Sequence, residues 1–195
     1  IAEAYTDQGV SDEAIRYMAA VISLDGCINI AKFSNRHLSP RVVLGSSYDR
    51  AEQLILFARS FGGRIFKHLD GHGMKQPSVS WQLNGKEMVK MMQILCKVPS
   101  PRQHLLIFMS QFPIRSEREL GFRRAEEMKT LSRWSPNAHE CITTPEQLAA
   151  LLDSSMVLSA NAARRNGLGL RLEVWQRDRS VLDAACAFVK GHGVS

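Results

Sequence analysis

The chain has 195 residues, of which 45% are hydrophobic and 23% are charged. This composition supplies enough apolar side chains for a real core and therefore excludes an intrinsically disordered protein. No apolar run approaches the roughly 18 residues that a transmembrane helix needs, so no membrane partner is expected. Lysine and arginine outnumber aspartate and glutamate by 25 to 19, and the net charge of +6 favours a polyanionic partner.

The first part of the chain predicts an alternation of helices and strand pairs. A helix is expected from a cap at Ser11 to Leu24, with Gly26 ending it. Residues 27–33 and 41–46 are rich in β-forming side chains and predict a hairpin whose turn is residues 34–40. Glycine pairs, prolines and apolar periodicity then predict a helix from Asp49 to Gly62, strands over 64–69 and 78–83, and helices over 86–97 and 102–112.

The rest of the chain divides into a charged segment and a second folded segment. Residues 113–144 are predicted to be a linker with a helix near 117–131. A helix beginning at Pro145, a basic hairpin and a last helix are expected in residues 145–195. The four cysteines are far apart and form no C-x-x-C pair, so they are predicted to be reduced and buried rather than zinc ligands.

Two stretches recur along the chain at nearly the same interval. MAAVISLDG at 18–26 matches LAALLDSSM at 148–156 with an offset of 130, and residues 47–63 match 176–193, where Asp49-Arg50 aligns with Asp178-Arg179 at an offset of 129. An internal duplication is therefore predicted, with a first repeat at 1–112 and a second, incomplete and degenerate repeat at 145–195. The two opening helices are expected to pack side by side about a pseudo-twofold axis through small residues, namely Ala19, Ala20, Ala149 and Ala150.

The two helix-ending stretches, each followed by a hairpin and a helix, resemble the LAGLIDADG homing endonuclease family in its single-chain, two-motif form. The resemblance implies an α+β fold, a duplicated αββαββα unit with pseudo-twofold symmetry. Its saddle-shaped antiparallel sheets would cradle duplex DNA. It also implies that an acidic residue at the eighth motif position of each repeat coordinates a divalent metal ion, and Asp25 occupies that position in the first repeat.

The second repeat departs from the family pattern. Its eighth position is Ser155, a neutral hydroxyl, and Asp153 is predicted to point about 200° away from it around the helix. The position at which the family places a basic residue near the active-site water falls on Ser100. One carboxylate is a poor site for two metal ions, so double-strand cleavage is not expected. No cofactor is predicted to be required, and magnesium is expected only if Asp25 is still a ligand.

Basic side chains in the hairpins are the candidates for phosphate contact, since such contacts supply most nucleic-acid affinity. A solvated charged surface is the competing interpretation for each of them. In the second hairpin, Trp175 is a candidate for stacking on a base. The nucleic-acid-binding candidates are Lys32, Arg36, His37, Arg41, Arg164, Arg165, Arg171 and Trp175.

These observations predict a catalytically inactive, LAGLIDADG-like protein that binds RNA within an organellar ribonucleoprotein. A mitochondrial ribosome component or an intron splicing (maturase) factor fits this hypothesis, with a mitochondrial or chloroplast location and other proteins of the particle as further partners. One alternative is a magnesium-dependent endonuclease or nickase of double-stranded DNA that uses Asp25. The other is a structural protein–protein module of a large assembly. In each case the chain is expected to be a monomer with an internal pseudo-dimer.

Overall fold

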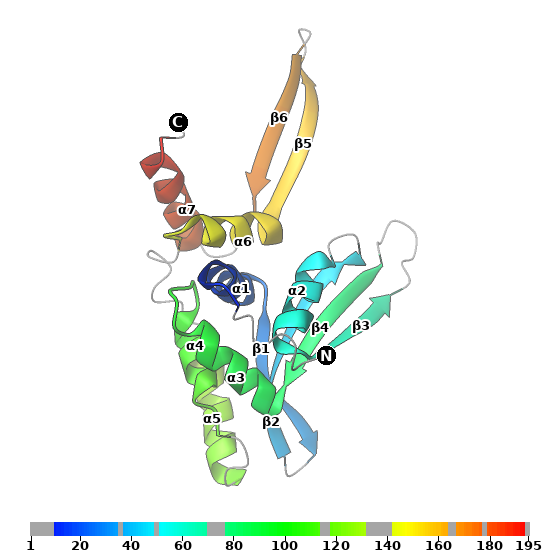
Figure 1. The fold of residues 1–195 in the computed structure, drawn as a ribbon, viewed down its shortest axis with the longest axis vertical. Helices are drawn as coiled ribbons and strands as arrows, with labels where there is room; N and C mark the ends of the chain where they lie inside the picture. Colours follow the sequence, from blue (N-terminus) through cyan, green and yellow to red (C-terminus); the bar gives the residue numbers. More distant parts are fainter. Residues whose placement is uncertain are drawn as a thin grey trace.

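The computed structural model describes residues 10–34, 37–48, 51–69, 77–113, 118–131, 142–163, 167–176 and 179–193. Helices and strands alternate along the chain as the sequence predicts (Figure 1). The elements up to residue 110 are α1 (Asp12–Leu24), β1 (Cys27–Ser34), β2 (His37–Ser47), α2 (Glu52–Phe61), β3 (Arg64–Leu69), β4 (Ser78–Asn84), α3 (Gly85–Leu95) and α4 (Gln103–Ser110). They are followed by α5 (Arg118–Leu131), α6 (Pro145–Ser155), β5 (Met156–Ala163), β6 (Gly167–Val174) and α7 (Arg179–Gly191).

The first repeat is a four-stranded antiparallel sheet in the order β1-β2-β4-β3, with helices against one face. Apolar residues of that face, among them Val42, Leu44 and Trp81, are fully buried. The ring of Phe57 on α2 lies 5.1 Å from that of Trp81, and the Trp81 indole donates a hydrogen bond to the Gly62 carbonyl. The alternation of apolar and polar residues along β4 therefore separates a core face from an open face.

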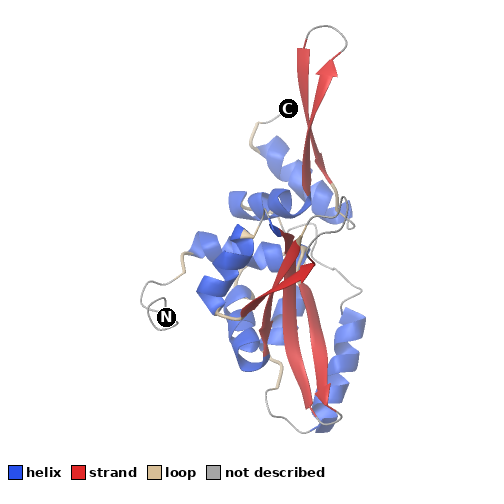
Figure 2. Ribbon diagram, turned by 90° about the vertical axis from the view of Figure 1, so that its right-hand side faces the viewer, coloured by secondary structure: helices blue, strands red, loops and turns tan. Residues whose placement is uncertain are grey.

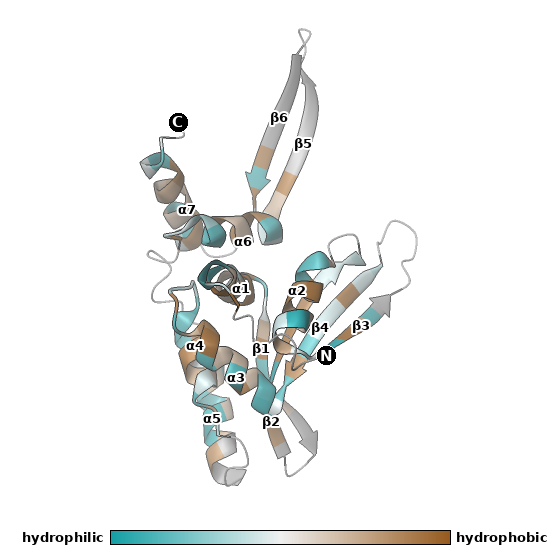
Figure 3. Ribbon diagram, in the orientation of Figure 1, coloured by the Kyte–Doolittle hydropathy of each residue, from teal (hydrophilic) through white to brown (hydrophobic). Residues whose placement is uncertain are grey.

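The helices are stabilised by packing their apolar side chains into the core. The run of apolar residues in α4 is brown in Figure 3, and this helix contributes Leu105, Leu106 and Met109 to the core. The linker helix α5, much of it hydrophilic, packs against α4 and contributes Met128. Within the described residues, none of the helices has the length and hydropathy that crossing a bilayer requires.

Helices α1 and α6 lie side by side, which confirms the central prediction from the repeat (Figure 1). The four-stranded sheet and the β5–β6 hairpin extend away from this helix pair in different directions (Figures 1 and 2). Leu24, near the end of α1, packs against both apolar clusters, the large one of the first repeat and the smaller one between α6 and α7. The molecule is thus two unequal units joined along one helix pair.

The register of the two hairpins supports the duplication at the level of single residues. Cys27 is opposite Val43 in the first hairpin, and Val157 is opposite Glu173 in the second. Both members of the second pair therefore lie 130 residues after those of the first. Because the two hairpins share one register from Cys27 to Lys32 and from Val157 to Ala162, Ser155 occupies the position of Asp25, as the motif alignment predicts.

Two sequence-based predictions are wrong. Residues 37–40 are strand rather than turn, and Pro40 lies opposite Ile30. Proline is tolerated there because the pairing of β2 with β4 begins only at Arg41, so the missing N–H lies where one side of the strand has no partner. The expectation of buried cysteines fails for Cys27 and Cys186, which are exposed free thiols, while Cys96 is half-buried and Cys141 lies outside the described residues.

Candidate nucleic-acid interface

Asp25 lies at the point where α1 meets the first strand. It is the C-cap of α1, and its backbone N–H donates to the Val21 carbonyl over 2.9 Å. The residue is solvent-accessible, yet the atoms packed around its carboxyl partly desolvate it and so raise its pKa, while the nearby positive charge of Arg102 acts in the opposite direction. Asp25 therefore lies at the end of α1 in surroundings that make its ionised carboxylate less favourable than it is in water.

Arg102 is a functional candidate that the sequence did not reveal. Its Nε donates to the Ser23 carbonyl over 2.7 Å, which satisfies a free carbonyl in the last turn of α1 and places the guanidinium beside Asp25. Ser100, where the family motif predicts a basic residue, is instead buried with a hydroxyl that has no hydrogen-bond partner. The positive charge near Asp25 thus comes from Arg102, two residues after Ser100. Sequence spacing alone does not place Arg102 next to α1.

The second repeat offers no matching acid. Ser155 is the last residue of α6, and its hydroxyl lies 3.2 Å from that of Ser154. Across the parts of the chain that the structure describes, no three His, Cys, Asp or Glu side chains form a group that could hold a metal ion. A lone carboxylate paired in sequence with a hydroxyl does not fit the two-metal arrangement that the family resemblance implies.

Asp153 faces the same groove as Asp25 but is already engaged. The groove has a volume of about 550 Å³ and is lined by residues of α1, β2, α2 and α6, including Asp25 and Asp153. The Tyr17 hydroxyl donates to the Asp153 carboxylate over 2.8 Å and accepts from Gln53 over 3.1 Å. Burial, together with this contact, raises the pKa of Tyr17 to about 12. The network ties α6 to both α1 and α2.

An ion pair joins the two repeats at equivalent positions. Arg16 of α1 and Glu146 of α6 are 130 residues apart, and a guanidinium nitrogen lies 3.2 Å from the carboxylate. The hydrogen bond from Arg16 is the largest of several contributions that lower the pKa of Glu146 to about 2. A pair of equivalent residues in contact marks the pseudo-twofold axis.

The small residues predicted at the contact of the two helices are buried, with one exception. Ala19, Ala20 and Ala150 are fully buried, and Ala150 belongs to the core cluster of the first repeat. Ala149 is exposed, so its prediction as an interface residue is wrong. One residue step turns a helical side chain by about 100°, and the side of α6 that Ala149 presents has no covering element among the described residues.

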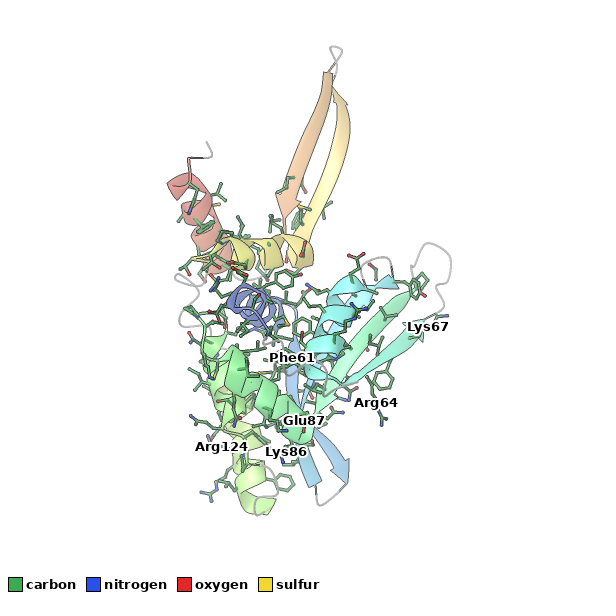
Figure 4. All side chains as sticks on the ribbon, in the orientation of Figure 1. Phe61, Arg64, Lys67, Lys86, Glu87 and Arg124 are labelled. Carbon is green, nitrogen blue, oxygen red and sulfur yellow. The ribbon has the colours of Figure 1, made fainter. Side chains whose placement is uncertain are left out.

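The face of the four-stranded sheet opposite the core is formed by residues of all four strands. Directly opposite residues share a face, so the residues that alternate with the buried ones line this side together. Two arginines belong to it: Arg41 donates to Asn29 Oδ1 over 3.0 Å, and Arg64 is exposed on β3 at the outer margin of the sheet (Figure 4). The other residues of this face are Cys27, Asn29, Ala31, Ser39, Val43, Gly45, Ser47, Phe66, Ser78, Ser80, Gln82 and Asn84.

The predicted nucleic-acid-binding residues are only partly described. Arg41 lies on the open face, and Arg171, opposite Ser159, occupies the equivalent strand position 130 residues later. Trp175 is 70% exposed, and its backbone N–H donates to the Ser155 carbonyl over 3.0 Å. Arg36, Arg164 and Arg165 lie outside the described residues, as do the side chains of Lys32, His37 and Arg171. Arg64 was missed, although the alternation along β4 points to the face it shares.

Comparison with known proteins places the fold. No protein-family model and no curated protein matches the sequence. Among solved structures, the meganuclease I-SmaMI bound to uncleavable DNA is 13% identical, with a TM-score of 0.61 over 92% of this chain and 74% of that one. The LAGLIDADG homing endonuclease I-LtrWI bound to target DNA is 11% identical, with a TM-score of 0.60 over 92% and 72%. The LAGLIDADG homing endonuclease I-GzeII in complex with its DNA target is 13% identical, with a TM-score of 0.58 over 92% of this chain and 71% of that one. At these identities the likeness is one of fold.

Proposed function

We propose that this chain, which has the fold of the LAGLIDADG homing endonucleases, binds double-stranded DNA and does not cut both strands. The observation that carries the proposal is the open face of the four-stranded sheet, which is polar, carries Arg41 and Arg64, and is left uncovered by the helices. The structural neighbours in DNA complexes favour DNA over RNA as the first candidate. The net charge of +6 supplies the attraction to phosphates.

Sheet side chains suit the reading of a major groove. Asn and Gln side chains donate to and accept from adenine edges, and Arg recognises guanine or phosphate. The open face offers all three types, since Asn84 is exposed and Gln82 donates to it over 2.9 Å. Two arginines and several neutral polar groups favour a binder in which direct contacts to bases matter beside the contacts to phosphates.

The seam of α1 and α6 supports the second half of the proposal. Hydrolysis of both strands in this fold would need an acid from each repeat, whereas here Ser155 takes the position of Asp25. Asp25 with Arg102 beside it would leave at most a one-strand activity. Binding and hydrolysis depend on different residues, so the first can persist without the second.

The direct test is selection from a mixed pool. Immobilised full-length chain would be offered random-sequence DNA duplexes, RNA hairpins and single-stranded RNA, and bound molecules would be amplified over several rounds. The expected result is enrichment of DNA duplexes, which remain uncut or are nicked in one strand when incubated with Mg²⁺. Selected duplexes cut in both strands, or a pool that becomes RNA, would contradict the proposal. Asp25→Asn distinguishes a nick made by this chain from a contaminating nuclease.

RNA binding in an organellar ribonucleoprotein is the second candidate, and Trp175 is the observation that favours it. A tryptophan that is 70% exposed at the base of a hairpin is available to stack on an unpaired base. Trp175→Ala would then weaken RNA binding while leaving duplex binding unchanged. A mitochondrial or chloroplast location belongs to this candidate and is tested by imaging the tagged native protein.

A further inference from the structure

Asn84 is the N-cap residue of α3, but its side chain does not cap the helix. An Asn side chain at this position usually accepts a hydrogen bond from a backbone N–H of the first turn. The Asn84 side chain makes no such bond, and its Oδ1 instead accepts from Nε2 of Gln82 over 2.9 Å. The Asn84 amide is therefore directed towards the open face of the sheet, where the residue is exposed.

The hydrogen bond between the two amides orients the Asn84 side chain. The described residues provide no other hydrogen-bond partner for either side chain. An amide oxygen can accept two hydrogen bonds and an amide nitrogen can donate two. Oδ1 of Asn84 therefore keeps one acceptor position and Nδ2 keeps both donor positions, so Asn84 presents an acceptor and a donor side by side on the open face.

Two arginines flank this amide pair on the neighbouring strands. Arg41 of β2 lies opposite Asn84, and Arg64 of β3 lies opposite Gln82. Neighbouring strands are about 4.8 Å apart, so β2 and β3, which lie on either side of β4, are separated by roughly 10 Å. The major groove of B-DNA is about 12 Å wide, so arginines on these two strands can reach phosphates at its two sides while β4 faces the bases.

We infer that Asn84, oriented by Gln82, reads the major-groove edge of one adenine in a DNA duplex. Adenine presents N7 as an acceptor and its N6 amino group as a donor, and a single Asn side chain satisfies both. Nδ2 of Asn84 donates to N7, and Oδ1 accepts from the N6 amino group. Asn84 is thus a specificity-determining residue and Gln82 is a positioning residue. The inference rests on the proposed function, because it names the base that the open face recognises.

Neither stability nor another base accounts for this arrangement equally well. An exposed hydrogen bond between two neutral side chains adds little to stability, because water satisfies the same groups in the unfolded chain. Guanine presents two acceptors to the major groove, cytosine one donor, and thymine one acceptor and a methyl group. Adenine is therefore the base that engages both the donor and the acceptor of Asn84.

The test is the base preference at single positions of the duplexes that the full-length wild type selects from a random pool. Each position of a selected duplex is changed in turn to the other base pairs, and the dissociation constants are measured. At one position the wild type should prefer adenine at least about fivefold. Asn84→Ala and Asn84→Asp should lose this preference and keep those at other positions, because neither new side chain can donate to N7. Aspartate is also a favoured N-cap residue, so Asn84→Asp guards against misfolding.

Gln82→Ala tests the positioning role. It should weaken the adenine preference at the same position as the Asn84 variants do. The matched control is Gln111→Ala, which removes an exposed amide at the C-cap of α4 and should change no preference. Because a neutral amide carries no charge, the salt slope of binding should be unchanged in all three alanine variants.

The outcomes separate this inference from the proposed function. A wild type that selects no duplex DNA overturns both. A wild type that selects duplexes whose base preferences survive in both Asn84 variants overturns this inference alone. An effect of Gln82→Ala at a different position, or an equal loss of preference at every position, also overturns it, because a residue that reads one base affects one position.

Discussion

The position of Asp25 at the end of α1 carries a cost in stability. Its pKa is raised by desolvation, so the ionised carboxylate is less favourable in the folded chain than in the unfolded one. The unfolding free energy should therefore rise as the pH falls through the folded pKa of Asp25. Asp25→Asn should raise the melting temperature at neutral pH, and the difference should shrink in acid. Thermal unfolding of both proteins across the acid range measures this effect; a variant less stable at neutral pH would contradict it.

The Arg16–Glu146 pair should change the stability with pH in the opposite direction. The pKa of Glu146 is about 2, against an ordinary value of 4.5. The ionised Glu146 carboxylate therefore stabilises the fold above pH 4.5, and this contribution is lost as the pH falls towards 2. Glu146→Gln should lower the melting temperature at neutral pH, with the gap closing in that acid window. The exchange Arg16→Glu/Glu146→Arg should recover part of what either single change loses, because the pair lies on the pseudo-twofold axis. Equal losses at every pH would contradict the pairing.

At the scale of elements, most of the fold follows from local pattern. The Ser11 cap, whose hydroxyl accepts from Ala14, and the apolar spacing of α1 were sufficient to predict that helix. In β4, residues that alternate along the strand separate the buried apolar side chains of Val79, Trp81 and Leu83 from the polar side chains of the other face. The strand at Pro40 was predicted as a turn because the sequence does not show where the pairing of β2 with β4 begins. A strand tolerates proline only where it has no partner on that side, and the partner strand is known only from the fold. Arg102 and Arg64 were missed for the same reason, since contact with α1 and position on a shared sheet face both arise only after folding.

Gly26 is required for its lack of a side chain. A Cβ at this position would lie 2.4 Å from the Ile22 carbonyl oxygen, a backbone atom that cannot move independently of α1. Gly26→Ala should therefore destabilise the fold by about 1–3 kcal/mol. Gly45→Ala is the matched control, because a Cβ there meets nothing within 4 Å. Chemical denaturation of both variants tests this, and equal stabilities would show that the junction relaxes freely.

At the scale of the whole molecule, two repeats of unequal size share one seam and present different surfaces. The first repeat is a complete sheet with a buried core, and the second is a hairpin with two helices joined to it through α1 and α6. The seam combines small residues, one ion pair and the Tyr17–Asp153–Gln53 network. In this arrangement one face of the four-stranded sheet stays open, while Asp25 of the first repeat is matched by Ser155 in the second.

The most direct measurement is the salt dependence of duplex DNA binding by the wild type and two charge-matched double variants. Arg41→Ala/Arg64→Ala removes two charges from the open face, and Lys86→Ala/Lys90→Ala removes two from α3, which covers the other face. The account predicts that the first pair weakens binding and makes the logarithmic salt slope shallower by about 1 per arginine, while the second pair leaves both unchanged. Equal slopes in all three proteins, or a loss confined to the α3 variant, would contradict the assignment of the open face as the nucleic-acid interface.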